Sequence, residues 1–240
     1  MVIIDRLSTL LRLGYAVQVK ILNLILPQRC LSCRSLGEII CEGCLYKLPK
    51  EANPYGITTL FSYSDSIVQR AIWLLKYKGV REIAKPLARM ANERLLEDLS
   101  SMAEFALLGN LVSKSNSSGS EKIVIVPVPL SKERERERGF NQAEILAREI
   151  VRLDESRSFE LRTDILKKIK DTPSQVSIKN RTERIKNLSK AFVLKNGWGI
   201  RGRLVVVLDD VTTTGTTLSE CVKVLKKAKP RRIIKVAIAH

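Results

Sequence analysis

Short, uninterrupted apolar runs alternate with amphipathic segments over the second half of the chain. Residues 122–128 and 203–208 are continuous apolar runs, a pattern typical of strands buried on both faces of a parallel sheet. Each run is followed by a polar loop and then by apolar residues at helical spacing, over 141–151 and 216–228, and a last strand is expected over 233–238. This repeated order predicts an α/β fold with a parallel sheet, in which ligands bind beyond the carboxyl ends of the strands.

The first half of the chain is less regular. The pattern predicts a strand over residues 57–63, a helix over 66–77 that Gly79 ends, and a second helix over 82–99. Residues 113–120 are polar and rich in Ser, which predicts a surface loop. We expect two domains, an N-terminal module over 1–54 and an α/β domain over 55–240.

The first 28 residues are apolar but are interrupted by Arg6, Arg12 and Lys20. The uncharged stretches between these cations are shorter than the ~20 residues that a spanning helix needs, and no small-residue cleavage site follows. We therefore expect an amphipathic helix that docks on the protein's own core in a cytoplasmic protein. The interleaved cations keep a membrane-surface position open as the minor alternative.

The net charge of the chain indicates anionic binding partners but does not identify which class of anion is bound. Forty-two Lys and Arg residues against 25 Asp and Glu give a formal net charge of +17. Such an excess attracts anions, which include nucleic acid, an anionic membrane and phosphorylated small molecules. With 45% hydrophobic residues, the composition excludes a disordered or fibrous chain.

Four of the five cysteines form two Cys-x-x-Cys pairs that are separated by seven residues. Four thiolates complete a tetrahedral Zn²⁺ site, so we expect a structural, zinc-ribbon-like module in which Gly37 and Gly43 give the backbone freedom for a tight hairpin. Buried, incidental cysteines are the alternative. The expected ligands are Cys30, Cys33, Cys41 and Cys44. For the remaining cysteine, Cys221, packing is favoured over a nucleophilic role.

The stretch from Val205 to Thr217 carries the most chemical information. Apolar residues lead to the acidic pair Asp209 and Asp210, and a loop of small hydroxyl residues with one Gly then leads into a helix. Backbone N–H groups at such a loop and helix N-terminus suit a phosphate, and two carboxylates beside it suit sugar hydroxyls or a divalent cation. The alternative is an ordinary strand end with a Thr-rich turn. The ordered pattern favours a phosphosugar site, with loop residues Thr212, Thr213, Thr214, Gly215, Thr216 and Thr217.

This stretch resembles the 5-phosphoribosyl 1-diphosphate (PRPP) binding signature of type I phosphoribosyltransferases. Further motifs stand in the order seen in the ComF family: residues 75–79, 126–129, 138–143, 171–175 and 187–192. Members carry a four-cysteine zinc module ahead of a phosphoribosyltransferase-like domain and are implicated in natural competence, the uptake of DNA by bacteria. The resemblance covers roughly residues 22–240.

The resemblance implies a role for each part of the site. Asp209 and Asp210 would hold the ribose hydroxyls, and residues 212–217 would hold the 5-phosphate. The segment from Pro127 through residues 138–142, which include Gly139, would face the pyrophosphate, with Arg138 and Lys76 as its cations, and Mg²⁺ would accompany PRPP. Thr212 and Thr216 stand where relatives often carry Leu and Ala, and both can still contribute their backbone N–H groups.

Two functions remain open. The first is a phosphoribosyltransferase whose acceptor the sequence does not identify. The second is an adaptor that binds single-stranded DNA and a competence helicase and senses PRPP or a related phosphosugar.

Two charged segments bear on the choice between these functions. Residues 132–138 alternate in sign, as in a solvated arm or a lid whose arginines close over pyrophosphate. Residues 221–240 carry cations and no acid, although no aromatic residue follows Trp198 to supply a stacking platform.

Overall fold

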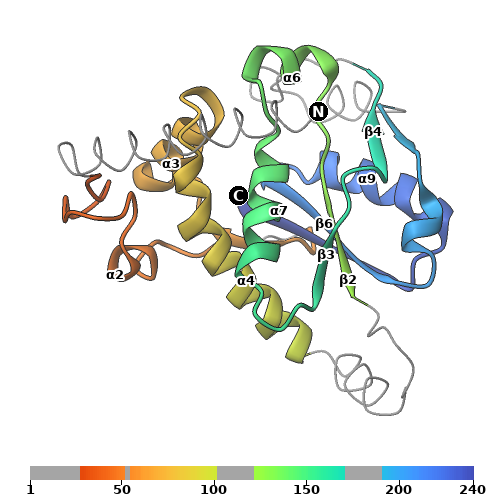
Figure 1. Ribbon diagram of the computed structural model, residues 1–240, viewed down its shortest axis with the longest axis horizontal. Coiled ribbons are helices and arrows are strands. Elements are labelled where there is room, and N and C mark those ends of the chain that lie inside the picture. The colour runs from red at the N-terminus through yellow and green to blue at the C-terminus, as the bar shows by residue number, and fades with distance from the viewer. Residues whose placement is uncertain (1–27, 52–54, 102–121, 171–190) are drawn as a thin grey trace, which may run out of the picture. The chain divides into compact units, whose positions relative to one another are not determined.

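The computed structural model (Figure 1) describes residues 28–51, 55–101, 122–170 and 191–240. The chain divides into two compact units, Met1–Lys47 and Leu48–His240, which are described separately. Apart from Gln28, the helix expected over residues 1–28 lies outside the described residues, as does the loop expected over 113–120. Among the described helices, none is long and apolar enough to cross a lipid bilayer.

The larger unit is built on a five-stranded sheet in which all neighbouring strands are parallel. Every residue of β2 and residues 204–208 of β6 are buried, which explains why these strands are apolar without alternation. The predicted parallel α/β fold is confirmed. The order across the sheet is β1 (Thr58–Phe61), β7 (Arg232–Ala239), β6 (Leu204–Val211), β2 (Ile123–Pro127) and β3 (Phe159–Leu161).

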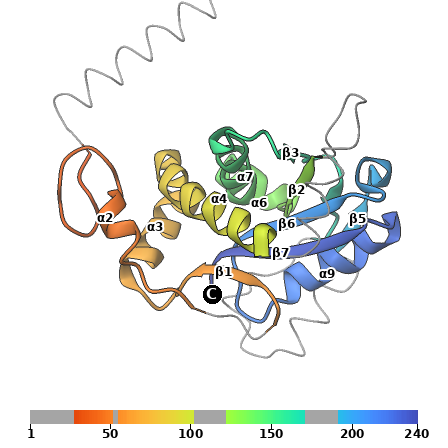
Figure 2. The same cartoon turned by 90° about the horizontal axis from the view of Figure 1, so that it is seen from below.

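Helices cover both faces of this sheet. Figure 2 shows α4 and α7 together on one face and α9 on the other. Asp65 and Asn141 cap α3 and α7 because their side chains accept hydrogen bonds from the first free backbone N–H groups of each helix. Helices of this unit include α3 (Ser66–Tyr77), η1 (Arg81–Ile83), α4 (Ala84–Ser101), α7 (Gln142–Leu153), α9 (Thr216–Leu225) and η3 (Lys226–Ala228).

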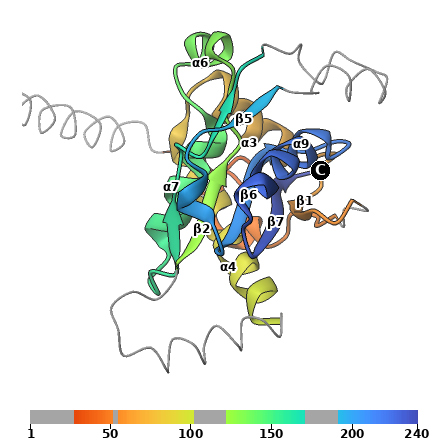
Figure 3. The ribbon, with the colours of Figure 1, turned by 90° about the vertical axis from the view of Figure 1, so that its right-hand side faces the viewer.

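The charged segment after β2 differs from the expected loop. Residues Lys132–Arg138 form a short helix, α6, which lies beyond the carboxyl end of β2 in Figures 1 and 3. Lys, Arg and Glu are good helix formers, and their alternating signs place opposite charges three residues apart along the helix. Gly139 ends α6 in the left-handed conformation at φ 74°.

Four further elements of the larger unit were not predicted. They are strand β3, the antiparallel pair β4 (Leu166–Lys168) and β5 (Phe192–Leu194), and the 3₁₀ helix η2 (Gly197–Ile200). Each has only three or four residues, too few for a hydrophobic period to show. The motif residues 171–175, and residues 187–190 of the next motif, lie outside the described residues.

A cluster of buried apolar side chains lies between the sheet and α9. Val205 and Val207 of β6 belong to it, together with Leu218, Cys221 and Leu225 of α9. Burying an aliphatic side chain of this size stabilises a fold by about 1.5–3 kcal/mol, so this cluster fixes α9 and the loop before it. Burial raises the pKa of Cys221 well above that of a free thiol, which agrees with packing rather than nucleophilic chemistry.

Candidate functional site

The acidic pair lies at the carboxyl end of β6. The strand runs three residues further than expected, through Val211, because β7 continues to pair with it as far as Ala239. Two local hydrogen bonds orient the carboxylates. Asp209 Oδ1 accepts from the backbone N–H of Asp210 at 2.9 Å, and Asp210 Oδ1 accepts from that of Val211 at 2.7 Å.

Lys76 joins the acidic pair from the last turn of α3. Its Nζ lies 2.9 Å from Asp210 Oδ2, and the two side chains are only 19% and 10% exposed. Removal from water lowers the pKa of Lys76, but the charge of Asp210 and its hydrogen bond outweigh this effect, so the pKa is raised. Lys76 therefore stays charged near neutral pH.

Asp209 is in a different electrostatic position. Removal of its carboxyl group from water and the adjacent charge of Asp210 raise its pKa to about 7, although Lys76 opposes the shift. The pair therefore combines one carboxylate that is compensated by a cation with one that gains or loses its proton near neutral pH. Such a pair can accept hydrogen bonds from hydroxyl groups or share a divalent cation.

The loop after β6 presents backbone N–H groups at the start of α9. The N–H of Thr212 donates to Ala239 O at 2.9 Å, and the hydroxyls of Thr214 and Thr216 lie 2.7 Å apart. Gly215 is the N-cap of α9, with φ 69° and no side-chain cap. A phosphate can accept hydrogen bonds from the backbone N–H groups at a helix N-terminus of this kind.

Gly215 is required at this position for two reasons. Its φ lies in the left-handed region, which disfavours other residues. A Cβ atom at Gly215 would also lie 2.7 Å from Cδ1 of Ile57, just before β1. The glycine thus allows the loop to pack against Ile57.

A cavity of about 550 Å³ adjoins the Lys76–Asp210 pair. Arg138 lies over the ring of Tyr77 at 5.2 Å and donates to Gln142 Oε1 at 3.0 Å, which holds its guanidinium near the start of α7. The excess of cations suits a polyanionic group. The lining residues are Lys76, Tyr77, Lys78, Gly79, Arg134, Glu137, Arg138 and Phe140.

The structure brings most of the predicted site residues to one edge of the sheet. Lys76 has electrostatic contacts with Asp209, Asp210 and Arg138. Pro127 ends β2 beside Leu208, the residue before the acidic pair. Gly139 ends α6, and residues 212–217 follow β6 but are not among those that line the cavity of Lys76.

Two contributions were missed in the sequence. His240 Nε2 lies 2.9 Å from the backbone carbonyl of Thr213, and the backbone of His240 pairs with Phe61 and Tyr63, so His240 supports the Thr loop. Tyr77 supports Arg138. A lone His far from the loop in sequence gives no signal of this contact, whereas Tyr77 stands inside the motif of residues 75–79 and could have been considered.

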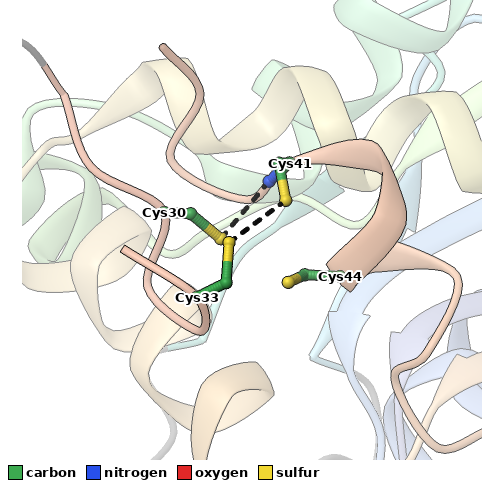
Figure 4. A group of neighbouring side chains, drawn as sticks. All are labelled: Cys30, Cys33, Cys41 and Cys44. Atoms are coloured by element: carbon green, nitrogen blue, oxygen red, sulfur yellow. Dashed lines mark hydrogen bonds between the residues drawn. The ribbon is translucent and has the colours of Figure 1, made fainter. Parts of the chain in front are cut away.

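The smaller unit holds the four cysteines together (Figure 4). Their sulfur atoms all lie within 4.8 Å of one another, and Cys33 Sγ is 3.6 Å from Cys41 Sγ. A tetrahedral site with Zn–S distances of ~2.3 Å places sulfurs roughly 3.8 Å apart, so the cluster could hold such an ion. Gly37 has the expected positive φ, at 117°. The expectation for Gly43 was wrong, because Gly43 lies inside the short helix α2 (Glu42–Leu45) and its φ is not positive.

Comparison with known proteins agrees with this geometry. Residues 97–240 match the phosphoribosyl transferase domain family. The chain belongs to this family. A curated relative, competence protein F of Haemophilus influenzae, is 38% identical over 92 residues, which are 38% of each chain, so the match spans well under half of that protein. Together with the cysteine cluster, these matches confirm the resemblance to the ComF family.

Solved structures show weaker likeness. Two structures described as analyses of an invariant aspartic acid in HPRTs, the glutamic acid and alanine mutants, are 13% identical with TM-scores of 0.38. Each match covers 65% of this chain and 67% of the other. The allosteric regulatory enzyme of purine biosynthesis is 21% identical with a TM-score of 0.29, over 54% of this chain and 24% of that one. These scores are too low to bear on function.

Proposed function

We propose that the chain binds PRPP together with Mg²⁺ at the carboxyl end of β6, as a phosphoribosyltransferase-type protein. The observation that carries this proposal is the acidic pair, compensated on one side by Lys76 and followed directly by a Thr- and Gly-rich loop that leads into the N-terminus of α9, where no side chain caps the helix. Asp209 and Asp210 accept hydrogen bonds from the ribose hydroxyls, and residues 212–217 donate to the 5-phosphate. Arg138 and Lys76 face the pyrophosphate. Pro127 and Gly139 lie at the two ends of the segment that carries Arg138.

The charges of the site suit displacement of pyrophosphate. When an acceptor attacks the anomeric carbon, its new bond replaces the bond to the pyrophosphate oxygen, and that oxygen leaves with the electron pair. Mg²⁺ held at the site would neutralise charge on this leaving group. Arg138, held by Tyr77 and Gln142, would stabilise the same developing charge without reorganisation.

Calorimetry with PRPP, with and without Mg²⁺, tests the proposal. We expect the wild type to bind PRPP more tightly with Mg²⁺, and the Asp209→Asn/Asp210→Asn variant to lose at least about 100-fold in affinity, since two charge-assisted contacts are removed. Glu155→Gln, an exposed acid on the same unit, is the matched control and should bind like the wild type. A wild type that does not bind PRPP would contradict the proposal.

We also propose that the cysteine cluster holds one structural Zn²⁺. All four donors are thiols of the chain, so the ion would have no open position for a reacting water. Metal analysis of freshly purified protein should find about one zinc per chain. Cys44→Ser should lose this zinc, and Cys221→Ala, which removes a thiol outside the cluster, should keep it. Zinc retained in Cys44→Ser would refute the assignment.

The setting we propose is natural competence in the cytoplasm, on the strength of the similarity to competence protein F. Within that setting, the adaptor alternative, with single-stranded DNA and a helicase as partners, is favoured by the cations that follow Glu220. The two functions are separated by pyrophosphate release. An enzyme releases it from PRPP when the acceptor is added, whereas an adaptor binds PRPP and leaves it intact.

A further inference from the structure

A second cation-lined pocket lies at the other end of β6. Its volume is about 400 Å³, and it is formed where η2 and the residues just before it meet η3. These segments directly precede β6 and β7, so the pocket opens at the amino ends of the two strands. The residues that line it are Leu194, Lys195, Gly197, Trp198, Arg201, Lys227, Ala228 and Lys229.

Trp198 is the unusual member of this set. Its side chain is 80% exposed, the highest value among the exposed large hydrophobic residues of the described chain. Arg201 lies over its ring at 5.5 Å. Exposure of an indole ring to water is unfavourable in hydrophobic free energy, and a ligand that covered the ring would remove this cost.

The framework around Trp198 is fixed by close packing. A Cβ atom at Gly197 would lie 3.1 Å from Cβ of Ala228, so η2 and η3 approach as closely as a glycine permits. The N–H of Gly202 donates to Lys229 O at 3.0 Å, and that of Arg231 donates to Arg203 O at 2.9 Å. Trp198 and the lysines of η3 are therefore held on one surface.

The charge of the pocket has one sign. Four of its lining residues, Lys195, Arg201, Lys227 and Lys229, are cations, and among the described residues that line it there is no Asp or Glu. Trp198 stands about thirty residues before the last of these lysines in the sequence, and the fold brings them together. An exposed aromatic ring among cations is suited to a planar aromatic group that carries phosphate.

We propose that this pocket binds one nucleotide of a single nucleic-acid strand. The base stacks on Trp198, and the phosphates on either side of it contact Lys227 and Lys229. A duplex would keep its bases stacked inside and would not use the indole, and an apolar partner would not favour four cations. The inference rests on the proposed function only for the setting of DNA handling, since its residues are separate from those of the PRPP site.

Fluorescence of Trp198 gives a direct test. The chain has two tryptophans, Trp73 and Trp198, so Trp73→Phe leaves Trp198 as the sole indole. We expect a dT12 oligonucleotide to quench its emission, and dTMP to bind at least about tenfold more weakly because it brings a single phosphate. Quenching by dTMP at the same concentration as dT12 would identify a free-nucleotide site instead, and unchanged emission with dT12 would overturn the proposal.

Variants separate stacking from charge. Trp198→Ala should weaken dT12 binding by about tenfold, the effect of losing one stacked base. Lys227→Gln should reduce the slope of log K against log salt concentration by roughly 0.7, which corresponds to one lost phosphate contact. Lys226→Gln makes the same charge change outside the pocket and should alter the slope by less than half as much. Equal effects of the two Lys variants would refute the proposed contact.

The two sites can fail independently. Trp198→Ala should bind PRPP like the wild type, and Asp209→Asn/Asp210→Asn should bind dT12 like the wild type. A wild type that binds dT12 but not PRPP would remove the proposed function and support the nucleic-acid pocket. Loss of dT12 binding in the Asp variant, with its fold intact, would instead overturn the separate site.

Discussion

A pocket lies near each end of β6, and the two pockets differ in whether acidic side chains accompany the cations. The carboxyl end combines two carboxylates with Lys76 and the cations of the adjoining cavity, whereas the amino end has cations and an exposed indole. The eight residues of the strand span roughly 23 Å from the first to the last, at a rise of ~3.3 Å per residue. A site with both signs can recognise hydroxyl groups and a divalent cation beside phosphate. A site with one sign recognises anions alone, and its selectivity must come from Trp198.

Burial separates the two ends as clearly as charge. Lys76 and Asp210 are mostly buried, so their geometry is part of the fold, and changing either disturbs stability and ligand binding together. Trp198 is mostly exposed, so changing it should alter binding alone. We therefore expect variants at the carboxyl end to have the larger effects.

The largest expected effect of a single substitution on PRPP affinity is that of Gly215→Ala. The new Cβ would occupy a left-handed backbone position and would meet Ile57 Cδ1 at 2.7 Å, so the loop must move. We expect PRPP affinity to fall about 100-fold, and the free energy of unfolding to fall by about 2–3 kcal/mol in chemical denaturation. Calorimetry measures the first quantity.

Gly202→Ala is its matched control. Gly202 has nearly the same φ, 72°, but a Cβ added there would have nothing within 4 Å. Its free energy of unfolding should fall by about 1–2 kcal/mol, because only the left-handed backbone position is unfavourable for Ala. Its PRPP affinity should stay unchanged. Equal losses of PRPP affinity in the two variants would show that the contact with Ile57 does not matter.

The next effect is that of Lys76→Met, which leaves Asp210 without its cation. We expect PRPP affinity to fall about 30-fold and unfolding to become easier by about 3 kcal/mol, because a largely buried carboxylate loses its partner. The control is Lys223→Met, in the Lys223–Glu220 pair, where the lysine is 69% exposed. Lys223→Met should lower the free energy of unfolding by less than about 1 kcal/mol and leave PRPP binding unchanged. Similar costs for both lysines would contradict the contrast in burial.

Titration of Asp209 gives a smaller effect that depends on pH. Its pKa of about 7 lies above the ordinary value of 3.8, so the folded chain holds this proton more tightly than the unfolded chain. Stability from this group is present at low pH and is lost as pH rises from about 4 to 7. PRPP affinity should change in the opposite direction and rise about tenfold between about pH 6 and pH 8, as the carboxylate forms.

Asp209→Asn isolates this contribution. The variant cannot ionise at this position, so the fall in stability between about pH 4 and 7 should be smaller than in the wild type, as measured by urea denaturation. Any remaining pH dependence of PRPP binding belongs to the ligand or to other groups. A wild type and a variant with parallel pH profiles would place the pKa of Asp209 near its ordinary value.

The sequence predicted the parts of the molecule that depend on local pattern. Strands β1, β2, β6 and β7 and helices α3, α4, α7 and α9 follow hydrophobic patterns, and the acidic pair, the Thr loop and the cysteines follow short motifs. Contacts between distant segments leave no such pattern. His240 supports Thr213, and Trp198 lines the same pocket as Lys229, because the sheet places strand ends side by side. The helix α6 was missed for another reason, since its charges suggested a solvated loop but also favour a helix.

The smallest expected effect is that of a change at Gly197, which also contacts a segment that is distant in the sequence. Gly197→Ala would bring a Cβ to 3.1 Å from Ala228 and 2.8 Å from the end of the Leu194 side chain. Leu194 can turn away, so we expect η2 to shift by roughly a few tenths of an ångström from η3 and dT12 affinity to fall about threefold. PRPP affinity, measured on the same sample, should not change. If Gly197→Ala weakened PRPP binding as much as dT12 binding, the two ends of β6 would be coupled through the sheet, and the separation of the two sites would fail.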